Sequence, residues 1–279
     1  MSGDPRNTLV LDGLADARLQ GVVAAQSYRA TTPMQVSASV APVRAAPAPD
    51  AEQLDQVLFG ETVEVLAERD GFAFGQAARD GYVGWVDLEA LSQPPLAPTH
   101  RVTALRTYGF SEPSIKSAPV GLISLNALVT AQGEADRFLR CARFGFVPSV
   151  HLAPVGEAFE TDPAEAALRF LGAPYLWGGR ESLGLDCSGL VQQAMLACGR
   201  AAPRDSDQQQ GIGTPLPPGA PLKRGDLVFW RGHVGIMLDP ETLLHANAFH
   251  MAVAREPLAE ARARIAAAGG GEITARRRP

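Results

Sequence analysis

Cysteine is scarce in this sequence, and its spacing does not fit a metal site. The 279 residues include only Cys141, Cys187 and Cys198, and no two of them form a CxxC pair. An odd number of widely spaced cysteines favours reduced thiols in a reducing compartment, and the missing CxxC pairs argue against zinc. We therefore expect neither a metal nor an organic cofactor. We interpret Cys141 and Cys198 as small buried hydrophobic residues.

Long apolar runs and basic segments are also missing. No stretch approaches the roughly 20 apolar residues of a membrane span, and Asp12, Asp16 and Arg18 interrupt the N-terminal region where a secretory signal would need an unbroken run. A net charge of −5 argues against nucleic acid, which binds basic surfaces. The basic run Arg276–Arg278 is interpreted as a solvated tail, with a docking signal as the alternative. These absences predict a soluble, cytoplasmic protein without nucleic-acid or membrane partners.

The periodicity changes along the chain in a way that predicts several domains, for which 279 residues are sufficient. Residues 1–33 carry a weak amphipathic pattern, and we expect them to form an N-terminal arm packed on a later domain. Residues 34–93 and 98–155 contain short alternating segments separated by turn residues, which predict two small β-barrels. The proline-rich segment between the two regions predicts a linker.

The C-terminal part, residues 160–279, changes to helices followed by strands. Asp162 and Pro163 form a typical helix start, with a capping side chain and a proline at the first helical position. That helix is expected to run to Leu171, and a second helix begins near Cys187. Apolar strands are predicted over residues 227–230, 233–238 and 242–246, with a last strand near 251–254. Helices that precede antiparallel strands indicate an α+β domain.

The most informative segment is Asp186-Cys187-Ser188-Gly189, which follows the glycine turn at Gly178-Gly179. A cysteine at the start of a helix lies where unpaired N–H groups and the helix dipole lower a thiol pKa. His233 and His245 follow downstream and can supply a base and a group that orients it. We therefore expect Cys187 to be charged at neutral pH and nucleophilic. The alternative is a buried structural thiol.

Six elements in a fixed order resemble the NlpC/P60 cysteine peptidases. They are Tyr175-Leu176-Trp177-Gly178-Gly179, Asp186-Cys187-Ser188-Gly189, Arg204-Asp205-Ser206, Gly225-Asp226-Leu227-Val228-Phe229, Gly232-His233-Val234-Gly235-Ile236 and His245. Each element alone is a weak signal, whereas their order is specific. The resemblance covers residues 160–275, and the Gly-Tyr-Val-Gly-Trp-Val segment at residues 81–86 is similar to bacterial SH3 domains. The fold implied is multidomain: two SH3-like β-barrels followed by a papain-like α+β peptidase domain.

The resemblance implies a role for each matching residue of the site. Cys187 is the expected nucleophile and His233 the general base. His245 is expected to orient His233 from a neighbouring antiparallel strand, with Asn247 and His250 as alternative orienting residues. The Tyr175 hydroxyl and the Cys187 backbone N–H are expected to form an oxyanion hole. Packing in the core is the alternative for Tyr175.

The resemblance also implies a substrate, the peptidoglycan stem peptide L-Ala-γ-D-Glu-diamino acid, cut after γ-D-Glu. Asp186 and Ser188 match positions that grip a free L-Ala amine. A stem with an amide-linked L-Ala would offer no charge to Asp186 and would leave its carboxylate unpaired. Glu52 and Tyr82 of the first barrel match positions that close this pocket. Their alternatives are a solvated loop charge for Glu52 and barrel packing for Tyr82.

Three further residues are expected near the γ-D-Glu end of the substrate. Ser206 and Trp177 match positions that contact γ-D-Glu, and Arg204 is close enough in sequence to help bind its carboxylate. The alternatives are a core aromatic for Trp177 and a structural ion pair for Arg204. With the rest, these residues predict a cytoplasmic peptidase of murein recycling that releases L-Ala-γ-D-Glu from free stem peptides. Two alternatives remain: an exported endopeptidase acting on intact peptidoglycan, and a non-catalytic SH3 protein that binds the cell wall.

Overall fold

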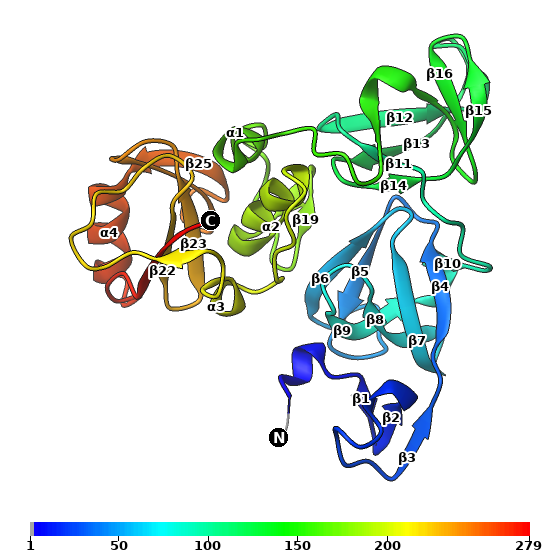
Figure 1. Ribbon diagram of the computed structural model, residues 1–279, viewed down its shortest axis with the longest axis horizontal. Helices are drawn as coiled ribbons and strands as arrows, with labels where there is room; N and C mark the ends of the chain where they lie inside the picture. Colours follow the sequence, from blue (N-terminus) through cyan, green and yellow to red (C-terminus); the bar gives the residue numbers. More distant parts are fainter. Residues whose placement is uncertain (1–2) are drawn as a thin grey trace. The chain divides into compact units, whose positions relative to one another are not determined.

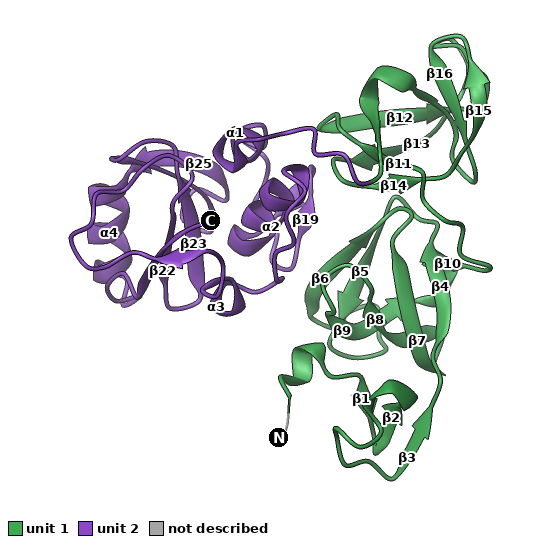
Figure 2. Cartoon of the chain, in the orientation of Figure 1, with its two compact units in different colours: residues 1–155 green, residues 156–279 purple. Residues whose placement is uncertain are grey.

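The structure, a computed structural model, describes residues 3–279 of the chain. The chain forms two compact units, residues 1–155 and residues 156–279 (Figure 2). Within the described residues, the first unit is built of strands and short 3-10 turns, and the α-helices all belong to the second (Figure 1). None of the helices between residues 3 and 279 combines the length and apolar character that a membrane crossing requires.

The described part of the first unit begins with a 3-10 turn at Pro5–Asn7, which a small sheet follows. The strands of this sheet are β1 (Val10–Leu11), β2 (Leu14–Asp16) and β3 (Ser27–Arg29). Leu9, which precedes this sheet, is buried in an apolar cluster with Phe72, Phe74 and Trp85 of the next sheet. The apolar residues of the N-terminal segment therefore serve to attach it to the following domain.

A seven-stranded sheet follows, in the order β10-β4-β7-β8-β9-β5-β6. Its strands are β4 (Thr32–Val36), β5 (Val40–Arg44), β6 (Gln53–Leu58), β7 (Thr62–Arg69), β8 (Phe72–Ala77), β9 (Val83–Asp87) and β10 (Leu91–Ser92). Alternate residues of these strands face one core, in which Val36, Val43, Val57, Val63 and Val86 are buried. The alternation of apolar residues in the sequence thus places the apolar side chains on one face of the sheet, where they are buried.

Gly84, in the middle of β9, shows why this segment contains glycine. A Cβ atom at Gly84 would lie 2.5 Å from Cγ1 of Val43 and 3.0 Å from the carbonyl oxygen of Arg44. Strands β5 and β9 meet there, with Arg44 opposite Trp85. The strands approach too closely for any side chain, so glycine is required by packing.

Residues 100–154 are also strands, but they form two sheets instead of one. The orders are β14-β11-β18 and β13-β12-β17-β16-β15. The strands are β11 (His100–Val102), β12 (Arg106–Phe110), β13 (Pro119–Ser124), β14 (Leu128–Val129), β15 (Ala131–Ala135), β16 (Phe138–Cys141), β17 (Gly145–Pro148) and β18 (Leu152–Pro154). Leu58, the last residue of β6, and Phe59 after it join the core of this region, and the centroid of the Phe59 ring lies 4.8 Å from that of Phe144. The shared core unites the two β-regions in one compact unit.

The second unit places helices before an antiparallel sheet. Its helices are α1 (Pro163–Leu168), α2 (Cys187–Ala197), α3 (Ser206–Gln209) and α4 (Leu258–Ala267), and β19 (Arg180–Glu181) pairs with β20 (Gly184–Leu185). The main sheet has the order β21-β26-β22-β23-β24-β25. Its strands are β21 (Thr214–Pro215), β22 (Leu227–Trp230), β23 (His233–Met237), β24 (Thr242–Asn247), β25 (Ala252–Pro257) and β26 (Ala275–Arg278). Helix α2 packs against β23 and β24.

The C-terminal arginine run is part of this sheet, so its interpretation as a solvated tail is wrong. Strand β26 lies between β21 and β22, with Arg276 opposite Val228 and Arg277 opposite Leu227. The Arg278 guanidinium bonds both carboxylate oxygens of Asp226, at 2.8 and 2.7 Å. Asp226 is buried, and pairing with a neighbouring strand together with this ion pair draws a polar segment into the sheet.

Replacement of Arg278 by alanine should therefore destabilise the second unit. The buried Asp226 carboxylate would lose its cationic partner, which is unfavourable for a desolvated charge. We expect a lower urea midpoint for Arg278→Ala in the full-length protein. Arg277→Ala on the same strand is the matched control and should remain near the wild-type midpoint. Equal midpoints for Arg278→Ala and wild type would show that the ion pair does not hold β26.

Candidate active site

Cys187 is the first residue of α2, and Asp186 is its N-cap. The Asp186 carboxylate accepts a hydrogen bond from the Gly189 N–H at 2.8 Å, which fixes the first turn of the helix. Cys187 is 7% exposed. The backbone N–H groups of Ser188 and Val234 both reach its sulfur, so the thiol lies between the start of α2 and the start of β23.

The glycines before and after Cys187 are required by close backbone contact. A Cβ atom at Gly189 would lie 2.3 Å from the carbonyl oxygen of Gly179, so the first turn of α2 touches the glycine turn directly. Gly178 has a φ of +70° and donates its N–H to Asp186 Oδ2 at 2.9 Å. The two glycine motifs that stand out in the sequence therefore form one folded unit around Asp186.

The two histidines come from neighbouring antiparallel strands. His233 opens β23 and His245 lies in β24, and the strands pair with Ile236 opposite Leu244. His233 Nε2 lies 2.8 Å from His245 Nδ1, a hydrogen-bond distance. The structure thus brings together the two rings that the sequence analysis predicted as a pair. His233 is partly buried and His245 completely buried.

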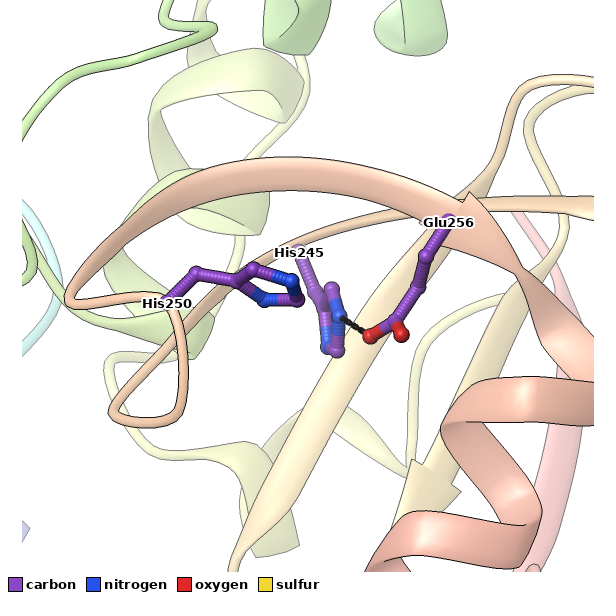
Figure 3. A group of neighbouring side chains, drawn as sticks. All are labelled: His245, His250 and Glu256. Atoms are coloured by element: carbon purple, nitrogen blue, oxygen red, sulfur yellow. Dashed lines mark hydrogen bonds and ion pairs between the residues drawn. The ribbon is translucent and has the colours of Figure 1, made fainter.

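A glutamate continues this chain of hydrogen bonds beyond His245. The Nε2 atom of His245 lies 2.7 Å from Oε1 of Glu256 in β25 (Figure 3), and the same oxygen is ion-paired with Arg264 of α4. Sequence reasoning missed Glu256 because it ended the last strand near residue 254. The signal that could have located it is the alternation of β25, which places Ala254 opposite His245 and Glu256 opposite Leu243.

Asn247 and His250, the alternative orienting residues, interact with each other instead. Asn247 Oδ1 accepts the backbone N–H of His250 and lies 2.9 Å from His250 Nδ1. The His250 ring lies on the other side of His245 from Glu256 (Figure 3). His245 is therefore the residue in contact with His233, and Asn247 shapes the turn between β24 and β25.

His245, His250 and Glu256 are the types of residue that bind metals, and their ligand atoms lie within 4.8 Å of one another. A cation there would have to replace the hydrogen bond between His245 and Glu256. It would also lie beside the Arg264 guanidinium, which is ion-paired with Glu256 and would repel it. We therefore interpret the group as hydrogen-bonded side chains and not as a metal centre.

Asp186 also has a buried cationic partner. Arg204 is 1% exposed and bonds Asp186 Oδ1 at 3.0 Å and Oδ2 at 2.7 Å. It also donates to Ser188 Oγ at 3.0 Å, and that hydroxyl lies 3.3 Å from Asp186 Oδ1. The argument that a substrate without an amine would leave Asp186 unpaired is wrong, because Arg204 already pairs with it. Arg204 therefore has the structural ion pair that was considered as the alternative to binding the substrate carboxylate.

Tyr175 and Trp177 differ in their surroundings although they are two residues apart. Burial, together with the charges of Cys187 and Asp186, raises the pKa of the Tyr175 hydroxyl. The phenol therefore keeps its proton at neutral pH. Trp177 is 59% exposed, so its interpretation as a core aromatic is wrong, and its indole is accessible to a ligand.

The remaining predicted residues lie at more distant positions in the chain. Ser206 is the first residue of α3 and is partly buried. Glu52 and Tyr82 belong to residues 1–155, whereas the cysteine and the histidines belong to residues 156–279. Glu52 is exposed just before β6, and Tyr82 is buried in the core of the seven-stranded sheet. The packing role considered for Tyr82 is thus present.

Comparison with known families accounts for this geometry. A model described as the NlpC/P60 family matches residues 172–264, and one described as a bacterial dipeptidyl-peptidase Sh3 domain matches residues 43–91. Gamma-D-glutamyl-L-lysine dipeptidyl-peptidase of Bacillus subtilis is 33% identical over 68% of this chain and 71% of that protein. The chain belongs to the NlpC/P60 family of cysteine peptidases. Its N-terminal part contains a bacterial SH3 domain.

A second relative and a solved structure are also similar to this chain. Dipeptidyl-peptidase 6 of Lysinibacillus sphaericus is 28% identical over 76% of this chain and 86% of that protein. The crystal structure of an NlpC/P60 family protein from Bacillus cereus superposes with a TM-score of 0.75, covering 88% of this chain and 99% of the other at 20% identity. That structure shows a shared fold. The SH3 match lies in the seven-stranded sheet, and a second SH3 domain at residues 98–155 stays a prediction.

Burial controls the charge state of the peptidase site. It raises the pKa of Cys187 to about 12, and the charge of Asp186 adds to this rise, while N–H groups and Arg204 oppose it. Burial likewise lowers the pKa of His233 to about 3. The prediction of a charged Cys187 in the free site is wrong, because desolvation outweighs the start of the helix. A neutral thiol and a neutral imidazole are the protonation states from which general-base activation starts.

Loss of Arg204 should destabilise the peptidase domain strongly. Arg204→Met leaves the Asp186 carboxylate buried without its counter-charge, and such changes lower the free energy of unfolding by about 3–5 kcal/mol. Denaturant unfolding of the full chain measures the effect. Arg200→Met, at an exposed arginine, is the matched control and should be near neutral. The double variant Asp186→Asn with Arg204→Met should recover part of the loss, and no recovery would contradict the pairing.

The buried histidines should make the domain less stable in mild acid. Burial lowers the pKa of both His233 and His245 to about 3, whereas unfolded histidines titrate near about 6.5. The unfolded state therefore gains protons first as pH falls below that value, and stability is lost. Between about pH 7.5 and about pH 5.5 we expect a loss of about 2–3 kcal/mol. Urea unfolding at both pH values measures it.

A variant identifies the histidines as the source of this effect. His245→Gln should reduce the pH-dependent loss by about half, even if its stability at neutral pH is lower. A difference between the two pH values that is the same in His245→Gln and in wild type would rule out the assignment.

Proposed function

We propose that this peptidase cleaves the γ-D-Glu–diamino acid bond of peptidoglycan stem peptides with a free N-terminal L-Ala. The observation that carries the proposal is the hydrogen-bonded pair His233–His245, next in sequence to the Val234 N–H that reaches the Cys187 sulfur, in a chain whose relatives are dipeptidyl-peptidases. The names of the dipeptidyl-peptidase relatives support the class of substrate. The position of Cys187 at the start of α2 and the histidine pair support hydrolysis through a thiol.

The proposed chemistry uses four residues, each at a stated atom. His233 Nε2 is engaged by His245, so Nδ1 is the nitrogen left to accept the Cys187 proton. The sulfur attacks the carbonyl carbon, and the Tyr175 hydroxyl and the Cys187 N–H bind the developing oxyanion. His233 then gives its proton to the leaving amine, and water hydrolyses the thioester.

The substrate's ends are proposed to bind on either side of the thiol. Ser188 Oγ is the proposed acceptor for the L-Ala ammonium, and the charge of Asp186 beside it is proposed to favour the cation. The exposed indole of Trp177 and the hydroxyl of Ser206 are proposed contacts for γ-D-Glu. Because Arg204 is occupied by Asp186, we assign it to the support of Asp186 and not to the substrate carboxylate.

We propose a place in cytoplasmic murein recycling rather than in remodelling of the intact wall. Cys141, Cys187 and Cys198 are all free thiols, which suits a reducing compartment. Free stem peptides with an unblocked amine are the corresponding substrate. Cell fractionation tests the location, and recovery of the protein outside the cytoplasm would favour the exported endopeptidase.

Defined peptides test the proposed specificity. We expect L-Ala-γ-D-Glu-L-Lys and its meso-diaminopimelate counterpart to be cut, with L-Ala-γ-D-Glu as product in mass spectrometry. The N-acetylated peptides should be cut at least about a hundred-fold more slowly in kcat/KM, because acetylation removes the ammonium that the proposed pocket binds and adds bulk at the same place. Cys187→Ala should be inactive, and Cys198→Ala is the matched control that should remain active.

Two outcomes would change the proposal. Equal cleavage of free and acetylated peptides would remove the free-amine rule and favour action on amide-linked stems. No cleavage of either, together with alkylation of Cys187 no faster than that of Cys141, would revive the wall-binding alternative.

A further inference from the structure

The chain of hydrogen bonds from Glu256 to His233 restricts where each proton can lie. His233 Nε2 and His245 Nδ1 are 2.8 Å apart, and His245 Nε2 and Glu256 Oε1 are 2.7 Å apart. A hydrogen bond needs one donor and one acceptor, and a neutral imidazole offers one of each. The position of one proton in this chain therefore determines the position of the others.

The Glu256 oxygen determines the direction of the hydrogen bonds in this chain, because it can only accept a hydrogen bond. Oε1 of Glu256 is ion-paired with the Arg264 guanidinium, which has only N–H donors, so this oxygen accepts from Arg264 and has no proton to give to His245. The proton between His245 and Glu256 must then belong to His245 Nε2. A neutral His245 is left with an acceptor at Nδ1.

The same reasoning passes on to His233. Since His245 Nδ1 accepts, His233 must carry its proton on Nε2, and its Nδ1 keeps a free electron pair. Nδ1 is the ring nitrogen nearer to the backbone of His233, and the next backbone N–H, that of Val234, reaches the Cys187 sulfur. The tautomer required by Glu256 is the one in which His233 can act as a base on that side.

We propose that Glu256, held by Arg264, is a positioning residue of this peptidase. It fixes the tautomer of His245 and, through it, that of His233, so that Nδ1 of His233 is the basic nitrogen. The proposal rests on the roles given to Cys187 and His233 under the proposed function. Glu256 does not contact the substrate or the sulfur in this assignment.

Contacts around Arg264 show that the pair is built into the domain. The Arg264 guanidinium lies over the Phe249 ring, 4.3 Å from its centroid, and the Phe249 and His250 rings meet edge to face at 4.9 Å. Arg264 comes from α4 and Glu256 from β25. Strand β25 and helix α4, which follow the two histidine strands in sequence, thus hold Glu256 in contact with His245.

Three substitutions separate the tautomer from simple packing. Glu256→Met keeps a side chain of similar length but has no acceptor for His245. Glu256→Gln keeps an amide oxygen that can accept from both His245 and Arg264, with loss of the charge. Glu260→Met, an exposed glutamate in α4, is the matched control.

The expected results differ for each variant. Glu256→Met should lower kcat about 10- to 100-fold with little change in KM, as loss of a residue that orients a functional histidine does. Ring nitrogen NMR of the histidine-labelled full-length protein should show a mixture of tautomers for His245 instead of one. Glu256→Gln should retain the wild-type tautomer and most of kcat. Glu260→Met should match wild type in both.

Two readouts keep this test separate from the identity of the substrate. The NMR tautomer and the rate of Cys187 alkylation by iodoacetamide need no peptide, so failure to cut stem peptides would count against the proposed function only. Unchanged tautomers and an unchanged alkylation rate in Glu256→Met would overturn the positioning role. If Glu256→Met does not fold, Glu256→Leu should give the same mixture of tautomers, and a single wild-type tautomer there would overturn the role of Glu256.

Discussion

The peptidase domain depends on the carboxylate of Asp186. One oxygen accepts from the Gly189 N–H and from Arg204, and the other accepts from the Gly178 N–H and again from Arg204. These bonds begin α2, close the glycine turn and neutralise a buried charge. Because Cys187 is the next residue, the position of its sulfur is fixed by the same contacts. The Asp186 carboxylate therefore caps helix α2 and also holds the glycine turn and Arg204 in place.

Burial gives this site its particular electrostatics. The start of α2 and two N–H groups favour a thiolate, yet Cys187 is surrounded by protein and has the Asp186 charge beside it. The free site therefore holds its proton on sulfur and leaves His233 neutral. The helix N-terminus still matters, because it stabilises the charge once attack begins. The same burial encloses His245 completely and opposes its protonation.

Sequence was a good guide wherever local chemistry decides the structure. The helix start at Cys187, the strands that carry His233 and His245, and the all-β nature of residues 34–155 follow from capping residues, glycines and periodicity. The Trp-Gly-Gly and Cys-Ser-Gly motifs have a local cause as well, namely the contact between Gly189 and Gly179. These features require no knowledge of distant partners.

Long-range pairing decides the features that sequence did not give. Arg276–Arg278 looks like a tail until β22 and β21 supply partners on both sides. Arg204 is an isolated arginine in a loop, and only the fold shows that it reaches Asp186. Glu256 gains its meaning from a register that places it near His245. In each case a charged side chain is buried or paired by a partner that lies far away in the sequence. Without knowledge of that partner, a charged residue is expected to lie in solvent.

These observations connect the proposed amine specificity with activation of the thiol. The charge of Asp186 raises the pKa of Cys187, and Arg204 offsets it only in part. An ammonium group bound beside Asp186 would add positive charge within the same buried region, where Coulomb interactions are weakly screened. Under the proposed binding mode, the amine would therefore position the peptide and also favour the thiolate. An acetylated peptide would lose both effects, so its defect would extend beyond KM to kcat.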